Sequence, residues 1–102
     1  MIRVSVMYPN SAGATFDMTY YTSKHMPMVQ KKVSTCKGIA AETGVAGGAP
    51  GSQPTYIAIG YLLFDSVESF EKGFNPHATE ILADVPNYTN VSPVIQISEI
   101  TL

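Results

Sequence analysis

Alternating apolar and polar residues predict strands at both ends of the chain and in its middle. Residues 2–8 alternate in this way and stop at a Pro-Asn pair, which predicts a first strand. A weaker second strand is predicted for residues 37–45, where glycine and alanine dilute the pattern. Residues 55–64, with the sequence TYIAIGYLLF, predict the strongest strand, apolar on both faces, and residues 94–102 predict the last one.

Two segments between these strands carry helical spacing instead. The run from Asp17 to Val33 starts with a good N-cap residue, and its apolar residues recur every three or four positions, with His25 among them. A second helix is predicted to begin at Ser66 and to run to residue 74. Asn75-Pro76 interrupts this helix, and residues 77–84 resume it.

The resulting order of elements is β-α-β-β-α-β, which predicts a ferredoxin-like α+β fold in one domain, residues 1–102. In this fold both helices cover one face of a four-stranded antiparallel sheet. The segments 55–64 and 94–102 offer apolar residues to both faces of that sheet. We therefore expect two sheets to pack face to face in a homodimer, as a dimeric α/β barrel.

Composition supports the same expectation. Charged residues make up only 14% of the chain, against roughly 25% in an average soluble protein. Too little charge for a small monomer indicates that part of the surface is buried against a second copy. The alternative is an uncharged but polar surface rich in Ser, Thr and Gly.

Several classes of function are disfavoured by the same residues. The net charge is -2 and there is no basic stripe, so we expect no nucleic-acid partner. The longest apolar run, residues 56–64, is too short to span a bilayer, and residues 1–8 do not form a signal peptide. A single cysteine, Cys36, permits no internal disulfide, and we expect a cytoplasmic protein.

Longer stretches of the sequence resemble the EthD family. The run VSVMYPN followed by FDMTYYTSKHMPMV is similar to the signature of that family, and the resemblance continues through GVAGGAPG, YIAIGYLLFDSVESFEKGF and PHATEILADVPNYTNVSPVIQISEI. It covers essentially the whole chain, and its most specific parts are HMP and NPHATEILADVPNYT. The family is named after a small protein required for bacterial degradation of ethyl tert-butyl ether. The resemblance implies a homodimeric α/β barrel and leaves the biochemical activity undefined.

His25 is the candidate catalytic residue, because an imidazole on the inner stripe of a helix needs a partner or a function. It is expected to donate or accept a proton at the mouth of a cleft between helix and sheet. The alternative is a core histidine that is hydrogen-bonded to backbone or to a tyrosine. No partner acid can be identified in the sequence. Pro27 removes one helical N–H, which either opens space beside His25 or only bends the helix.

The candidate ligand-binding residues are histidines and tyrosines that topology can bring to one cleft. Phenols beside an imidazole suit an aromatic or apolar ligand. His77 can pair with Glu80 on its own helix, or it is simply a solvated residue at a helix start. Two scattered histidines without ligand spacing predict neither a metal site nor a cofactor. The full set is Tyr8, Tyr21, His25, His77 and Tyr88.

Three functions follow from these candidates. The first is the binding of a small apolar or aromatic metabolite between the first helix and the sheet, in the context of a degradation pathway. The second is a small cofactor-independent enzyme, a monooxygenase, isomerase or decarboxylase, in which His25 transfers a proton. The third, the least favoured in a chain of 102 residues, is a haem-binding barrel, as in some relatives of this fold.

Overall fold

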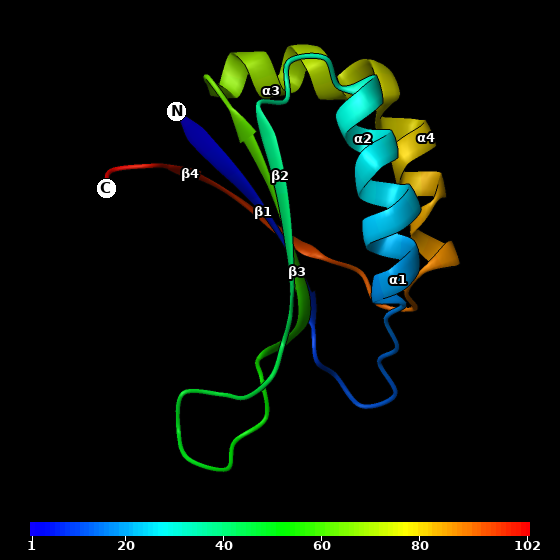
Figure 1. Ribbon diagram of the computed structural model, residues 1–102, viewed down its shortest axis with the longest axis vertical. Helices are drawn as coiled ribbons and strands as arrows, with labels where there is room; N and C mark the ends of the chain where they lie inside the picture. Colours follow the sequence, from blue (N-terminus) through cyan, green and yellow to red (C-terminus); the bar gives the residue numbers. More distant parts are fainter.

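The computed structural model describes residues 1–102 and confirms the predicted ferredoxin-like α+β fold (Figure 1). One antiparallel sheet is formed in the spatial order β2-β3-β1-β4. Because the first and third strands in sequence are central, the two crossover segments pack on the same face. The strands are β1 (Ile2–Pro9), β2 (Gly38–Thr43), β3 (Tyr56–Phe64) and β4 (Val94–Glu99).

Two helical segments cover one face of this sheet (Figure 1). The first is continuous but changes its winding, through α1 (Met18–Tyr20), the π-helical turn η1 (Tyr21–His25) and α2 (Met26–Lys32). The second runs through α3 (Val67–Phe74), the 3-10 turn η2 (Asn75–His77) and α4 (Ala78–Ala83). A further 3-10 turn, η3 (Val85–Asn87), follows it.

The helix ends and the contact between the segments have simple chemical causes. The Asp17 side chain accepts a hydrogen bond from the backbone N–H of Tyr20, and Ser66 caps α3 in the same way. Lys32 on α2 and Glu80 on α4 lie 2.9 Å apart, so an ion pair joins the two helical segments on their outer side. Asn75-Pro76 does not interrupt the second segment but only tightens it into the 3-10 turn.

The core lies between the helices and one face of the sheet. In β1, Val4 and Tyr8 point towards the helices, and they stand opposite Leu62 and Ala58 of β3. From the helices, Val29 packs against this layer. The full set of buried apolar residues is Ile2, Val4, Tyr8, Tyr21, Met26, Val29, Val33, Ala58, Leu62, Phe64, Ile81 and Tyr88.

The second face of the sheet is left open by the chain itself. The expectation that β3 is buried on both faces is therefore not met within one chain: its residues alternate between buried and half-buried. Ile59, Tyr61 and Leu63 stand opposite Met7, Ser5 and Arg3 on this open side. On β4, Val94 lies opposite Met7 and is 51% exposed.

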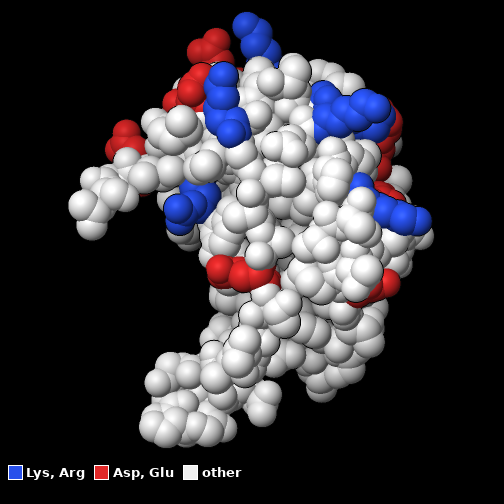
Figure 2. Space-filling view, viewed as in Figure 1, with Lys and Arg blue, Asp and Glu red and all other residues white.

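Other features differ from the sequence expectations at the ends of elements. The last strand ends at Glu99 instead of residue 102. Val67 and Leu82 of the second helical segment are apolar but exposed. The loop between β2 and β3 protrudes from the body as an arm, the green loop in Figure 1, and Figure 2 shows no Lys, Arg, Asp or Glu on this protrusion.

Candidate functional site

The π-helical turn places His25 against the sheet. The backbone N–H of Met26 donates to the carbonyl of Tyr21, five residues back, where a regular α-helix would use the residue four back. The next residue, Pro27, has no N–H and so cannot restore the regular pattern. Tyr21 and His25 are both buried by this arrangement, and their rings stack with centroids 5.4 Å apart.

The imidazole of His25 has a carboxylate partner. Its Nδ1 atom lies 2.8 Å from Oδ2 of Asp84, the residue that ends α4. The other oxygen of this carboxylate accepts hydrogen bonds from the Tyr20 hydroxyl at 2.6 Å and from the Asn87 side chain at 2.9 Å. Asp84 is thus held in one orientation by three donors, and it fixes the imidazole in turn.

Burial decides the charge of His25, and hydrogen bonds decide that of Asp84. Desolvation lowers the pKa of His25 and outweighs the opposing effect of the hydrogen bond and charge of Asp84. For Asp84, desolvation acts upwards, but the hydrogen bonds from Tyr20, Asn87 and His25 together hold its pKa below the usual range. At neutral pH the imidazole is therefore neutral, with Nδ1–H donating to the carboxylate and a lone pair on Nε2.

Two tyrosine hydroxyls lie on the Nε2 side of His25. The Tyr88 hydroxyl is 3.4 Å from Nε2, which is a long hydrogen bond, and 2.7 Å from the hydroxyl of Tyr8. Burial raises the pKa of both phenols well above the ordinary tyrosine value, so both stay protonated. Nε2 is consequently a weakly engaged base next to two neutral O–H donors.

A small apolar cavity adjoins these groups. Its volume is about 60 Å³, and 12 of its 14 lining residues are hydrophobic. The exposed lining residues Leu82 and Ile95, which are 55% and 54% exposed, mark its open side. The lining consists of Val6, Tyr8, Tyr21, His25, Met26, Val29, Leu62, Phe74, Ile81, Leu82, Val85, Tyr88, Pro93 and Ile95.

The cavity limits what can enter. Liquid water occupies about 30 Å³ per molecule, and a benzene ring fills an apolar cavity of about 150 Å³. A space of about 60 Å³ therefore admits the end of a ligand, while its remaining part must lie over the open side. A porphyrin does not fit this cavity, so the residues present do not support the haem hypothesis.

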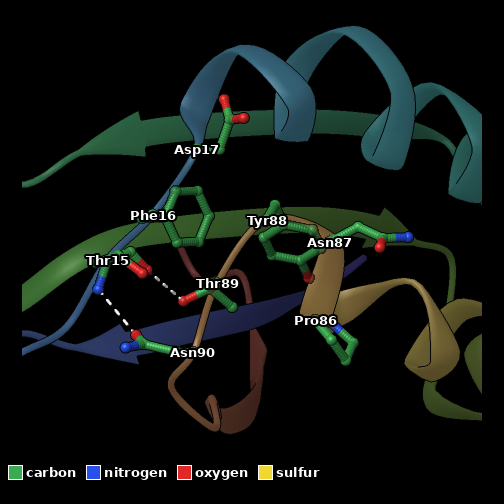
Figure 3. A pocket seen from close by; sticks show the side chains of 8 residues that line it. All are labelled: Thr15, Phe16, Asp17, Pro86, Asn87, Tyr88, Thr89 and Asn90. Carbon is green, nitrogen blue, oxygen red and sulfur yellow. Dashed lines mark hydrogen bonds between the residues drawn. The ribbon is translucent and has the colours of Figure 1, made fainter.

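A larger and shallower groove, about 380 Å³, lies on the other side of Tyr88 (Figure 3). Its polar groups are largely bonded to each other: Thr89 donates to the carbonyl of Thr15, and Asn90 accepts from the Thr15 N–H. Phe16 and Tyr88 face each other in the groove, with ring centroids 5.3 Å apart. These bonds hold the Tyr88 segment in place and already use the polar groups of the groove. We therefore place the candidate site in the inner cavity.

The structure brings together four of the five residues proposed from the sequence, and leaves one apart. Tyr8, Tyr21, His25 and Tyr88 all line the inner cavity. His77 does not line it: its Nδ1 atom lies 3.6 Å from Glu80, on the second helical segment. His77 therefore lies outside the group of residues that adjoins His25.

Three polar residues of the site were missed by sequence reasoning. Asp84 is the acid partner of His25 that the sequence does not identify, and a regular helical period places Tyr20 away from the inner stripe of its helix. No local pattern marks Asn87, which lies beyond the end of the second predicted helix. Asp84, Asn87 and Tyr88 all belong to the stretch ADVPNYT, whose resemblance to the EthD signature was the available signal.

No group of three or more His, Cys, Asp or Glu side chains is placed so that it could hold a metal ion. None of the helices is both long and apolar enough to cross a membrane.

Comparison with known proteins settles the family. The model of the EthD domain matches residues 13–92. The chain belongs to the EthD family. Its match includes the whole first helical segment, Asp84 and Tyr88, but not Tyr8 in β1.

Individual relatives agree with this assignment. An uncharacterised 11.0 kDa protein from the thcB–thcC intergenic region of Rhodococcus erythropolis is 34% identical over 92 residues, which is 88% of this chain and 85% of that protein. The crystal structure of an EthD-like protein from Ralstonia eutropha is 44% identical, with a TM-score of 0.94 over 99% of this chain and 92% of that one. A dimeric protein of unknown function and ferredoxin-like fold from Bacteroides fragilis shares the fold, at 13% identity and a TM-score of 0.57 over 97% of this chain and 94% of that one.

Proposed function

We propose that this EthD-family protein binds a small apolar or aromatic metabolite at the cavity between the first helical segment and the sheet, within a degradation pathway. The observation that carries the proposal is the orientation of His25. Its Nδ1 atom is engaged by Asp84 at 2.8 Å, whereas Nε2 has only the long 3.4 Å contact with the Tyr88 hydroxyl. His25 also lines a cavity whose wall is largely hydrophobic. An apolar wall with a few fixed polar groups is the usual character of a small-molecule site.

The same geometry favours a second candidate function, a cofactor-independent enzyme such as an isomerase, decarboxylase or monooxygenase. A neutral imidazole oriented by a carboxylate is a competent general base, because the carboxylate stabilises the imidazolium that forms. Lowering of the pKa by burial keeps Nε2 unprotonated at neutral pH. Binding and proton transfer would use the same residues, and the two candidates differ only in whether a bond is broken.

We also propose a homodimer in which two copies pack through the open face of the sheet. This face presents half-buried apolar residues such as Met7, Ile59 and Leu63, and the exposed Val94. Burial of apolar area against a second copy would stabilise it by about 25 cal/mol per Å². The Bacteroides fragilis protein shows that a chain of this fold can be dimeric.

The first experiment is an NMR titration of both histidines with a panel of small aromatic and ether-like compounds. We expect the His25 ring signals and their pH midpoint to move when a ligand binds, because the ligand displaces solvent at Nε2. His77 lies outside the cavity and serves as an internal control in the same spectrum.

The two candidates are then separated by His25→Ala and by deuterium uptake. A binding protein loses affinity in the variant and never exchanges ligand protons with solvent. An enzyme incorporates deuterium into a bound carbon acid, and the variant loses this exchange while it still folds. A panel that leaves His25 unresponsive at every pH rejects the cavity as the binding site.

A further inference from the structure

The hydroxyl groups of Tyr8 and Tyr88 meet at one wall of the inner cavity. Their oxygens are 2.7 Å apart, and the Tyr88 oxygen lies 3.4 Å from Nε2 of His25. Tyr8 comes from β1, whereas Tyr88 follows η3, so the fold joins them across 80 positions. Two O–H donors beside one base resemble the arrangement by which enzymes stabilise a developing oxyanion.

In the free protein the two hydroxyls form a short chain of hydrogen bonds with His25, and a ligand oxygen can replace these bonds. Because Nδ1 donates to Asp84, Nε2 can only accept, and Tyr88 is the donor that faces it. When Tyr88 donates to Nε2, its oxygen accepts from Tyr8. A ligand oxygen at this place can accept from both hydroxyls, which releases the Nε2 lone pair to take a proton.

We propose that the hydroxyl pair of Tyr8 and Tyr88 is an oxyanion-binding site, and that its ligands are small apolar compounds with an acidic proton at a phenol or beside a carbonyl group. This inference rests on the proposed function and names the ligand class of the same cavity. The pair supplies what binding to His25 alone does not: a place for the negative charge that remains when the proton leaves.

The proposed proton transfer requires no oxidant, reductant or other co-reactant. With a phenol, the O–H bond breaks, an N–H bond forms at Nε2, and the phenolate oxygen keeps the electron pair. With a carbonyl compound, the C–H bond beside the carbonyl breaks, and its electron pair moves to the oxygen as an enolate. His25 becomes an imidazolium next to Asp84. Return of the proton to the same carbon restores the compound, and where a further double bond is conjugated with the enolate, return of the proton to the far carbon of that double bond gives an isomer.

Cavity size and lining support this ligand class. About 60 Å³ accommodates a carbonyl or phenolic C–O group with its nearest carbons, and no more. The apolar remainder of the ligand would rest on Leu82, Pro93 and Ile95 at the open side. Burial keeps both tyrosines protonated, which makes them neutral donors and not competing anions.

The test uses 4-nitrophenol, whose anion absorbs visible light, at a pH below the pKa of the free compound. We expect wild-type protein to bind it and to increase its ionised fraction. Tyr8→Phe and Tyr88→Phe keep the rings but remove one donor each, and each should weaken binding of the anion roughly ten- to a hundredfold. Tyr61→Phe, which removes a hydroxyl on the opposite face of the sheet, should change nothing.

A neutral companion, 4-nitrotoluene, separates failure of this inference from failure of the proposed function. The inference is overturned if both compounds bind, the phenol stays neutral, and Tyr8→Phe and Tyr88→Phe bind it as wild type does. Absence of binding by both compounds overturns the proposed function as well. Circular dichroism of each variant checks the fold, and loss of anion binding with retained 4-nitrotoluene binding supports the oxyanion site even in a destabilised variant.

Discussion

The imidazole of His25 and the carboxylate of Asp84 lie 2.8 Å apart, although 59 positions separate them in the sequence. The pair joins the π-helical turn of the first helical segment to the end of α4. Side-chain exposure is 5% for His25 and 18% for Asp84, so water screens their interaction only partly. The position of this pair determines both the tautomer of His25 and the atom that it presents to the cavity.

Replacement of the carboxylate is the direct test of this relationship. In Asp84→Asn the charge that favours the imidazolium is gone, while desolvation remains, so we expect the pKa of His25 to fall further below its ordinary value. NMR titration of the His25 ring measures it. The control is Glu80→Gln, a carboxylate beside the other histidine, which should leave the His25 titration unchanged. An unaltered His25 midpoint in Asp84→Asn would mean that the pair does not form in solution.

The pH dependence of stability follows from the directions of the same pKa shifts. The folded-state pKa of His25 lies below 6.5, so the unfolded chain takes up the proton first as the pH falls. The free energy of unfolding should therefore decrease on acidification through about pH 6.5 and level off below the folded-state pKa. Asp84 acts in the same direction, with stability lost below its ordinary value of 3.8.

Urea unfolding at a series of pH values measures this dependence. The glutamine in His25→Gln cannot titrate. In this variant the free energy of unfolding should therefore change little between pH 7 and the onset of carboxylate protonation, about pH 4. Stability that increases as the pH falls through this range in the wild type would show that the folded state favours the charged imidazole, contrary to our assignment.

The sequence pattern was sufficient for the fold, because strand and helix periods depend on local spacing. Residues 2–8 and 55–64 alternate as strands do, and the structure places strands there. The site depends on contacts that no local pattern encodes. Asp84 reaches His25 only because α4 packs beside the first helical segment. A regular helical period would place Tyr20 away from the inner stripe, but its long side chain reaches Asp84.

A glycine in β3 makes room for the aromatic cluster around His25. A Cβ atom on Gly60 would overlap the hydroxyl oxygen of Tyr21, which stacks on the imidazole. We expect Gly60→Ala to destabilise the fold by about 1–3 kcal/mol through overpacking, and to shift the His25 ring signals as Tyr21 moves. Thermal unfolding and NMR measure the two effects.

Gly48→Ala in the protruding arm is the matched control for this substitution. A Cβ atom there meets nothing within 4 Å, and the backbone does not have a positive φ. The control should be neutral or slightly stabilising, because alanine restricts the unfolded chain. Equal stability of the two variants would contradict the close approach of Tyr21 to β3.

The open face of the sheet gives the last prediction, which concerns assembly. If two copies pack through this face, a charge at its centre must be buried without a partner, which is strongly unfavourable. Met7 lies on the central strand β1 of this face, between Ile59 and Val94 on the neighbouring strands. We expect Met7→Glu to convert a dimer of the wild type into a monomer in analytical ultracentrifugation.

Val67→Glu is the control for this substitution. It also adds a charge at an apolar residue, 42% exposed on the helical side, and should stay dimeric. A wild-type protein that sediments as a monomer at high concentration rules out the proposed dimer, and a Met7→Glu dimer assigns the interface to another surface.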